Sequence, residues 1–224
     1  MLFILLIGVP MIIGIWAQMK VSGTYKKYSD VAAKSGITGR EAAAYILRRF
    51  DIHDVEIVPT EGLLTDHYDP MHKRLVLSKK NYFGNSLAAL GVAAHEAGHA
   101  VQHKVGYRAL KMRMALVPIT QFSSQMLPFV IIGGLVFKMT GLIYLGILVY
   151  LILTIFQLVT LPVEFDASKR ALAWMERTGV AASIDQGRAR NALHWAAMTY
   201  VVAALSSLAW LGYYLFQLLG MNEE

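Results

Sequence analysis

Residues 94–100 read Ala94-His95-Glu96-Ala97-Gly98-His99-Ala100, and the rest of the fold is organised around this stretch. On a helix, side chains four residues apart are neighbours, with about 5–6 Å between their Cβ atoms, so His95 and His99 can bind one metal ion. Glu96 follows the first histidine, at the edge of the metal-facing side, where its carboxylate can reach a metal-bound water. Two histidines, a third protein ligand and an open fourth position are typical of a catalytic zinc site. The stretch therefore predicts a zinc-binding helix that carries its own general base.

The surrounding residues favour a helix here. Residues 86–105 contain no proline and several Ala and Leu residues, and either Asn85 or Ser86 can serve as the N-cap. Histidine and glutamate are costly in such an apolar run unless they have partners. Because the chain contains no cysteine, any zinc must be bound by His and carboxylate ligands.

The composition indicates a membrane protein. Hydrophobic residues make up 56% of the chain, whereas soluble domains usually have about 45–50%. We expect four membrane-spanning helices, at residues 1–19, 116–138, 142–161 and 196–219. The second of these should face other helices more than lipid, because polar residues and a proline interrupt it: Gln121, Ser123, Ser124, Gln125 and Pro128.

The basic residues predict the orientation. Of the 21 Lys and Arg residues, fifteen lie between Lys20 and Arg113, one is Lys138, and five lie between Lys169 and Arg190. The positive-inside rule then places the polar segments 20–115 and 162–195 in the cytoplasm and both chain ends outside. The net charge of +6 thus reflects membrane topology, and we expect no nucleic-acid partner.

The polar segment 20–115 contains the expected soluble elements. Thr38 and Glu41 fit a capping box ahead of a short amphipathic helix. Residues 55–58 and 74–77 read as two strands, with a turn at 66–70 between them. If the strand at 74–77 forms a sheet edge above the zinc helix, it can bind an extended substrate by strand addition.

The third metal ligand must lie on the same side of the membrane as His95 and His99. Glu164 fits, since it follows the third span directly and Pro162 suits the first turn of a new helix. A carboxylate so close to the membrane is poorly placed without a partner, although a glutamate stabilised only by the helix dipole is the alternative. Asp166, two residues further on, either orients a ligand histidine or caps the helix.

Four other side chains are weaker candidates for the site. His67, in the expected turn, and Tyr200, in the fourth span, can each stabilise an oxyanion. His103 lies one helical turn beyond His99 and reads as a polar helix end, and His194 reads as an interfacial residue. We expect none of the three histidines, His67, His103 and His194, to bind the metal.

Three motifs follow one another along the chain. They are Asp66-His67-Tyr68-Asp69-Pro70 with Leu75-Val76-Leu77-Ser78, then residues 91–99, then Leu161-Pro162-Val163-Glu164-Phe165-Asp166-Ala167-Ser168. Together they resemble the YugP-type neutral zinc metallopeptidases, which are small bacterial membrane proteins, and the resemblance covers essentially the whole chain. It implies a multi-pass zinc peptidase of the bacterial cytoplasmic (inner) membrane, of the gluzincin kind, with a cytoplasmic zincin-like catalytic domain. In plan it is similar to HtpX-like and CAAX prenyl endopeptidases.

The resemblance also implies the role of each site residue. His95, His99 and Glu164 would be the zinc ligands, and Glu96 would be the base. Those relatives usually carry an aspartate four residues after the ligand glutamate, where this chain has Ser168. We therefore assign the role of that aspartate to Asp166.

We expect a mainly α-helical fold with a small β-hairpin or sheet, and a membrane-bound zinc endopeptidase acting at the cytoplasmic face. Its partners would be a peptide or membrane-protein substrate and the lipid bilayer. A metzincin is excluded, because Gln102 and Val105 occupy two positions that its motif requires as Gly and His. One alternative is an intramembrane protease of the site-2 type, although no Leu-Asp-Gly occurs in a span. The other is a membrane scaffold with a non-catalytic zinc site, which the absence of cysteine argues against.

Overall fold

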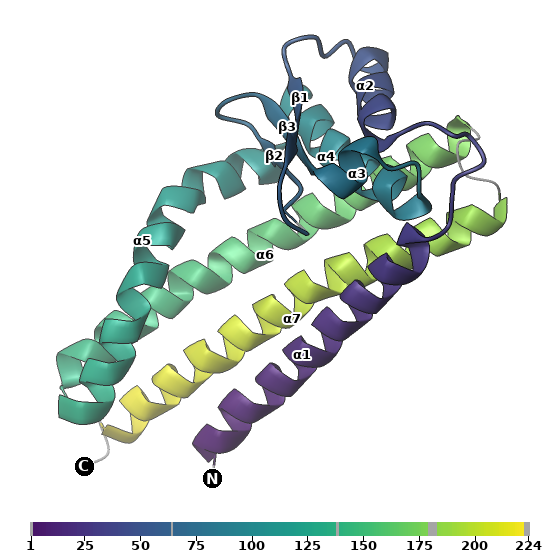
Figure 1. The fold of residues 1–224 in the computed structure, drawn as a ribbon. Coiled ribbons are helices and arrows are strands. Elements are labelled where there is room, and N and C mark those ends of the chain that lie inside the picture. Colours follow the sequence, from purple (N-terminus) through teal and green to yellow (C-terminus); the bar gives the residue numbers. More distant parts are fainter. Residues whose placement is uncertain (1, 64, 138, 179–182, 222–224) are drawn as a thin grey trace.

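The computed structural model describes residues 2–63, 65–137, 139–178 and 183–221, and it is mainly helical with one small sheet (Figure 1). Four long helices run alongside one another, and the short elements gather at one end of them. The elements are α1 (Leu2–Ser29), α2 (Gly39–Arg49), β1 (Glu56–Thr60), β2 (His67–Asp69), β3 (Arg74–Ser78), α3 (Lys79–Phe83), α4 (Leu87–Lys104), α5 (Arg108–Phe137), α6 (Thr140–Arg177) and α7 (Ser183–Met221).

Among the described residues, three helices, rather than the expected four, are long and apolar enough to cross a membrane. They are parts of α5, α6 and α7: Arg108–Gly134, Gly141–Arg177 and Gly187–Phe216. The expected first span, residues 1–19, is not among them. The apolar stretch of α1 ends at Ala17, and the helix continues through Gln18 and Lys20 into a polar half. α1 packs along α7.

The helix boundaries also differ from the expected ones. Pro162 does not begin a new helix, because α6 runs through it without a break. Proline inside a helix removes one backbone hydrogen bond. Val163 and Ala167, which follow Pro162 in the helix, are fully buried, and their packing stabilises α6 beyond the proline. The expected polar segment 162–195 therefore consists, in its described part, of the ends of α6 and α7.

The sheet has the order β1-β3-β2. The two expected strands do pair, but they run parallel, with Ile57 opposite Leu75. The segment 66–70 is no simple turn, because it contains β2, which pairs antiparallel with the other side of β3. Asp69 forms the β2–β3 turn by accepting the N–H groups of Met71 and His72. The hypothesis that residues 74–77 form a sheet edge is wrong, since β3 is the central strand.

Two predicted helix caps are confirmed. Thr38 and Glu41 form a capping box at the start of α2, where the Thr38 N–H donates to Glu41 Oε2 at 2.7 Å. Ser86 is the N-cap of α4, and its hydroxyl accepts the N–H of Ala89. α2, α3 and β3 all pack against α4, which places the zinc-binding stretch at the centre of the short elements.

Candidate metal centre

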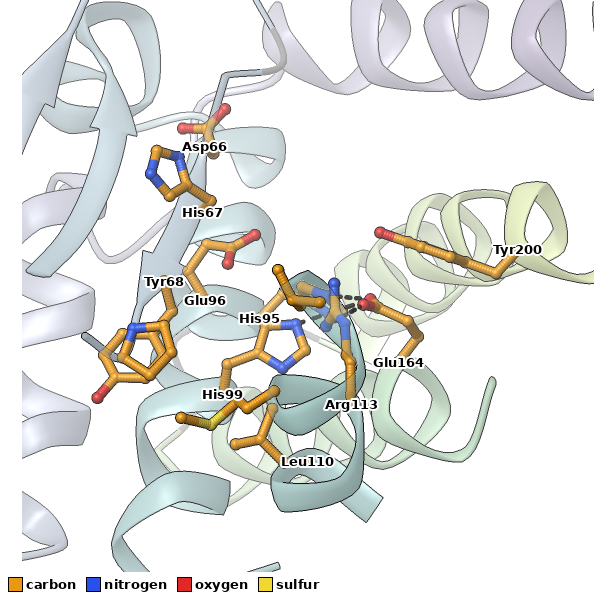
Figure 2. A pocket seen from close by; sticks show the side chains of 13 residues that line it. Asp66, His67, Tyr68, His95, Glu96, His99, Leu110, Arg113, Glu164 and Tyr200 are labelled. Carbon is orange, nitrogen blue, oxygen red and sulfur yellow. Dashed lines mark hydrogen bonds and ion pairs between the residues drawn. The ribbon is translucent and has the colours of Figure 1, made fainter. Parts of the chain in front are cut away.

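Three side chains from two helices meet at one point (Figure 2). His95 and His99 project from successive turns of α4, and Glu164 projects from α6. Glu164 Oε2 lies 3.2 Å from His95 Nε2 and 3.7 Å from His99 Nε2. The structure thus brings together the three residues that the sequence proposed as ligands, and among the described residues they form a group able to hold a metal ion.

Glycine lets the two helices approach closely enough for this meeting. A Cβ atom on Gly98 would lie 3.0 Å from the carbonyl oxygen of Ala167 and 3.3 Å from its Cα. Gly98 is three residues after His95, and Ala167 is three residues after Glu164, so the close contact is one helical turn from the ligands. A larger side chain at position 98 would push α6 and its carboxylate away from the histidines.

The spacing of these atoms suits zinc. Ligand atoms about 2.0–2.1 Å from a tetrahedral zinc ion lie about 3.3 Å from one another, close to the two distances above. The local charge also favours a cation. Burial lowers the pKa of His99, but the Glu164 and Glu96 carboxylates outweigh burial and raise it above its ordinary value. With imidazole and carboxylate donors, the three residues fit the metal.

A buried amide orients His99. The Nδ1 atom of His99 lies 3.0 Å from Gln102 Oε1, so the amide accepts the Nδ1–H and leaves Nε2 free to bind metal. Gln102 is itself fixed, because its Nε2 donates to Val163 O and to Asp166 Oδ2, both at 2.8 Å. Arg170 also donates to Asp166. Asp166 therefore contacts no ligand histidine directly and acts through Gln102.

His95 and Glu164 each have a further partner. Ser168 Oγ lies 3.2 Å from His95 Nδ1, so the serine at the position of the relatives' aspartate holds the first histidine itself. Arg113, from α5, donates to Glu164 Oε1 at 3.0 Å and leaves the other carboxylate oxygen facing the histidines. The sequence patterns did not predict that Gln102, Ser168 and Arg113 each bond to one of the three ligand residues. Their positions in the sequence could have indicated these contacts. Gln102 is three residues after His99, Ser168 is four residues after Glu164, and Arg113 lies just before an apolar span.

The metal centre opens into a cavity of about 230 Å³. Glu96 is buried on α4 beside His95, and its carboxylate points into this cavity (Figure 2). Both oxyanion candidates also line it: His67 from β2, exposed and bonded through Nδ1 to Thr65 O, and Tyr200 from α7. The Tyr200 hydroxyl points toward the cavity.

The remaining histidines named above lie apart from the ligands. His103 pairs with the Tyr68 hydroxyl at 2.8 Å, one turn beyond the metal centre. His194 lines a different cavity, between α6 and α7. Neither belongs to the group of described residues that could hold a metal ion.

Two histidines one turn apart on a helix and a glutamate from a second helix form a group that could hold a metal ion beside a cavity, and three helices are long and apolar enough to cross a membrane. The chain belongs to the family described as "Putative neutral zinc metallopeptidase", which matches residues 3–219. It is similar to the "Putative membrane protease YugP" of Bacillus subtilis (strain 168), with 43% identity over 208 residues. This alignment covers 93% of the chain and 92% of the relative. No solved structure matches the chain.

Proposed function

We propose that this protein is a zinc-dependent endopeptidase of the HExxH-plus-glutamate (gluzincin) type, which cleaves polypeptides at the cytoplasmic face of the bacterial inner membrane. The observation that carries the proposal is the arrangement of His95, His99 and Glu164 around one point, with Glu96 directed into the adjoining cavity. Membership of a zinc metallopeptidase family supports the same class of reaction.

Each residue of the cavity has a separate role in the proposed reaction. Zinc, when bound, would activate a water molecule and polarise the scissile carbonyl. Glu96 takes the proton from the attacking water and later delivers it to the leaving amine. The Tyr200 hydroxyl and the His67 ring, which both line this cavity, are proposed to donate a hydrogen bond to the carbonyl oxygen. Arg113 balances the charge of Glu164 and holds its rotamer.

The substrate backbone pairs with β2 in this proposal. β2 is an edge strand of the sheet, and His67 and Tyr68 line the cavity. An extended peptide can add to such an edge through main-chain hydrogen bonds. A peptide inhibitor N-methylated at the paired amides should bind about tenfold more weakly than its parent, because each lost hydrogen bond costs about 1 kcal/mol. Equal binding of the two inhibitors would contradict pairing with β2.

The orientation follows from the basic residues. The sheet and the metal centre lie at the end of the long helices where Lys26 and Lys27 end α1 and Arg177 ends α6. The positive-inside rule assigns this end to the cytoplasm. Alkaline phosphatase or reporter fusions after residue 221 should report an outside C-terminus, and a cytoplasmic signal there would refute the orientation.

Substitution Glu96→Gln tests the function itself. In purified chain in lipid vesicles with one equivalent of zinc, hydrolysis of β-casein should fall about 10²–10⁴-fold, which is the usual contribution of a general acid–base. Zinc content should not change, because Glu96 is not a ligand. Glu176→Gln, an exposed glutamate on α6, is the matched control and should retain activity. A membrane scaffold with non-catalytic zinc would keep its cellular phenotype in Glu96→Gln, and a Glu96→Gln protein with full hydrolysis would refute the mechanism.

A further inference from the structure

One face of α5 begins in the metal cavity and continues into the membrane-spanning part of the helix. Leu110, Arg113, Met114 and Val117 line the cavity. Residues four and seven positions further along a helix lie on nearly the same face, so this face continues as Gln121 and Ser124, with Gln125 beside them. Gln121 lies about 6 Å beyond Val117 along the axis, and Ser124 about 10 Å. We call Gln121, Ser124 and Gln125 the polar track.

The polar track is exposed although it lies within a candidate span. All three side chains are exposed, and all belong to the apolar stretch Arg108–Gly134. Phe122, about 100° around the helix from Gln121, is 65% exposed and suits lipid. Amide side chains in hydrocarbon are costly unless a partner satisfies them. The expectation that this span turns its polar residues toward other helices of the chain holds for Ser123, which is buried, and does not hold for the three residues of the polar track.

Two prolines interrupt the backbone hydrogen bonding of α5 in the same region. Pro118 and Pro128 lie inside α5, and a proline has no N–H to donate to the carbonyl four residues before it. The carbonyls deprived of this partner are those of Met114, in the cavity, and Ser124, in the track. Unsatisfied carbonyls are strongly unfavourable in a bilayer. The track and its surroundings thus offer hydrogen-bond acceptors as well as the donors of two amides.

The neighbouring helices leave this face accessible. α5 and α7 both pack along α6, rather than along each other, in the described part of the chain (Figure 1). Tyr200 of α7 and Glu164 of α6 line the cavity opposite α5. The track is therefore a continuation of the wall of the cavity, on the membrane side of the metal centre.

We propose that the polar track binds the membrane-embedded segment of the substrate protein and leads its cytoplasmic end to the metal centre. This inference rests on the proposed function and names its substrate class as polypeptides anchored in the membrane. Continuity with the cavity decides the occupant, since a substrate held in the cavity and continuing into the bilayer must pass along this face. The side-chain amides of the track, and the carbonyls four residues before the two prolines, can pair with the N–H and C=O groups of a substrate helix that unwinds at its end.

Disulfide cross-linking tests the contact without requiring hydrolysis. Because the chain has no cysteine, single cysteines can be placed in a Glu96→Gln background at Gln121 or Ser124, or at Phe122 as the control. The probe is a single-span polypeptide with a β-casein tail and one cysteine near the cytoplasmic end of its span, incorporated in the same vesicles. Cross-linking should be at least fivefold more efficient at Gln121 and Ser124 than at Phe122. Equal efficiency at the three sites, or disulfides mainly between two copies of this chain, would overturn the proposal.

A kinetic experiment separates this inference from the proposed function. Gln121→Leu combined with Ser124→Ala should raise KM about tenfold for the span-tethered tail relative to the detached tail, as the loss of interhelical hydrogen bonds would. Phe122→Leu is the matched control and should change neither KM. If the wild type cleaves both tails and the double variant shows no such difference, the track is not a docking site. If the wild type cleaves neither tail, the proposed function fails, and cross-linking still decides whether the track binds the probe.

Discussion

Replacement of the buried Gln102 by leucine should weaken zinc binding about 10–100-fold. Leucine is apolar and of comparable volume, although it branches one carbon nearer the backbone, so the main effect of the change is the removal of hydrogen bonds. The bonds removed are those to His99 Nδ1, to Val163 O and to Asp166. Because Gln102 contacts no metal, the effect would report the orientation of a ligand through its neighbour.

The size of the effect follows from which partners are left unsatisfied. Asp166 retains its bond from Arg170 at 2.6 Å, and the Val163 carbonyl lies inside α6. His99, which is only 7% exposed, loses the acceptor for its Nδ1–H. A buried donor without a partner costs about 1–3 kcal/mol, and each 1.4 kcal/mol is about tenfold in affinity. Without metal the imidazole can change its tautomer, so the cost falls on zinc binding, which requires a free Nε2.

The assay is competition with a fluorescent zinc chelator at one neutral pH, with thermal unfolding as a measure of folding. Gln18→Leu, an exposed glutamine on α1, is the matched control and should bind zinc as the wild type does. Gln102→Glu keeps an acceptor for His99, so it should bind zinc more tightly than Gln102→Leu, although repulsion from Asp166 lowers its Tm. A folded Gln102→Leu protein with a zinc Kd within threefold of wild type would refute the reasoning.

Three further predictions concern the helix contact, the metal and a cap. Gly98→Ala should weaken zinc binding and lower Tm, because the new Cβ would lie 3.0 Å from the Ala167 carbonyl oxygen; unchanged zinc affinity by chelator competition would show that the helices tolerate it. Removal of metal by EDTA should abolish β-casein hydrolysis, and free zinc at 100 times its Kd should restore it and stabilise the fold by about 2.7 kcal/mol, seen as a higher Tm. Hydrogen bonds from the Thr38 backbone and hydroxyl lower the pKa of Glu41 from its ordinary 4.5, so their stabilisation is present above that pH and is lost as the pH falls through the lowered value. Backbone amides of α2 should therefore be better protected from hydrogen exchange in the wild type than in Glu41→Gln at neutral pH, and this difference should shrink below pH 4.5.

The sequence predicted the parts of the site that spacing encodes. Four-residue spacing places His95 and His99 on one helical face whatever the rest of the chain does, and Ser86 caps that helix as expected. Glu164 could be proposed because few carboxylates lie just beyond a span on the same side of the membrane. The structure brings these residues together through the contact of Gly98 with Ala167, which no sequence pattern displays.

The sheet could not be predicted from local patterns. β2 has three residues, and its Asp69-Pro70 sequence is typical of a turn, which it does form at one end. Parallel pairing of β1 with β3 depends on contacts between segments that are distant in sequence. The strand proposed as the edge, β3, therefore became the central strand, because a segment read as a turn occupies its free side.

Uncharged partners of the histidines were missed for a different reason. Gln102 and Ser168 are common helix residues. Gln102 lies one turn after His99 on α4 itself, whereas only the position of α6 against α4 brings Ser168 to His95. Asp166 drew attention because it is charged, yet it reaches His99 only through Gln102. A search for charged residues thus finds Asp166 and overlooks Gln102, which is the direct partner of His99.

Arg113 connects the metal centre with the helix that carries the polar track. Its guanidinium bonds to Glu164 Oε1 at 3.0 Å, and its own helix face continues through Gln121 and Ser124. A displacement of α5 that breaks this bond would take the arginine away from Glu164, which is only 2% exposed, and a buried charge that loses its ionic partner is costly. The ligand geometry is therefore coupled to the position of α5. Glu164 is on α6 and its partner Arg113 is on α5. A substrate helix bound along α5 would therefore act on the metal centre through this ion pair, since the described structure has no other bond from α5 to a ligand residue.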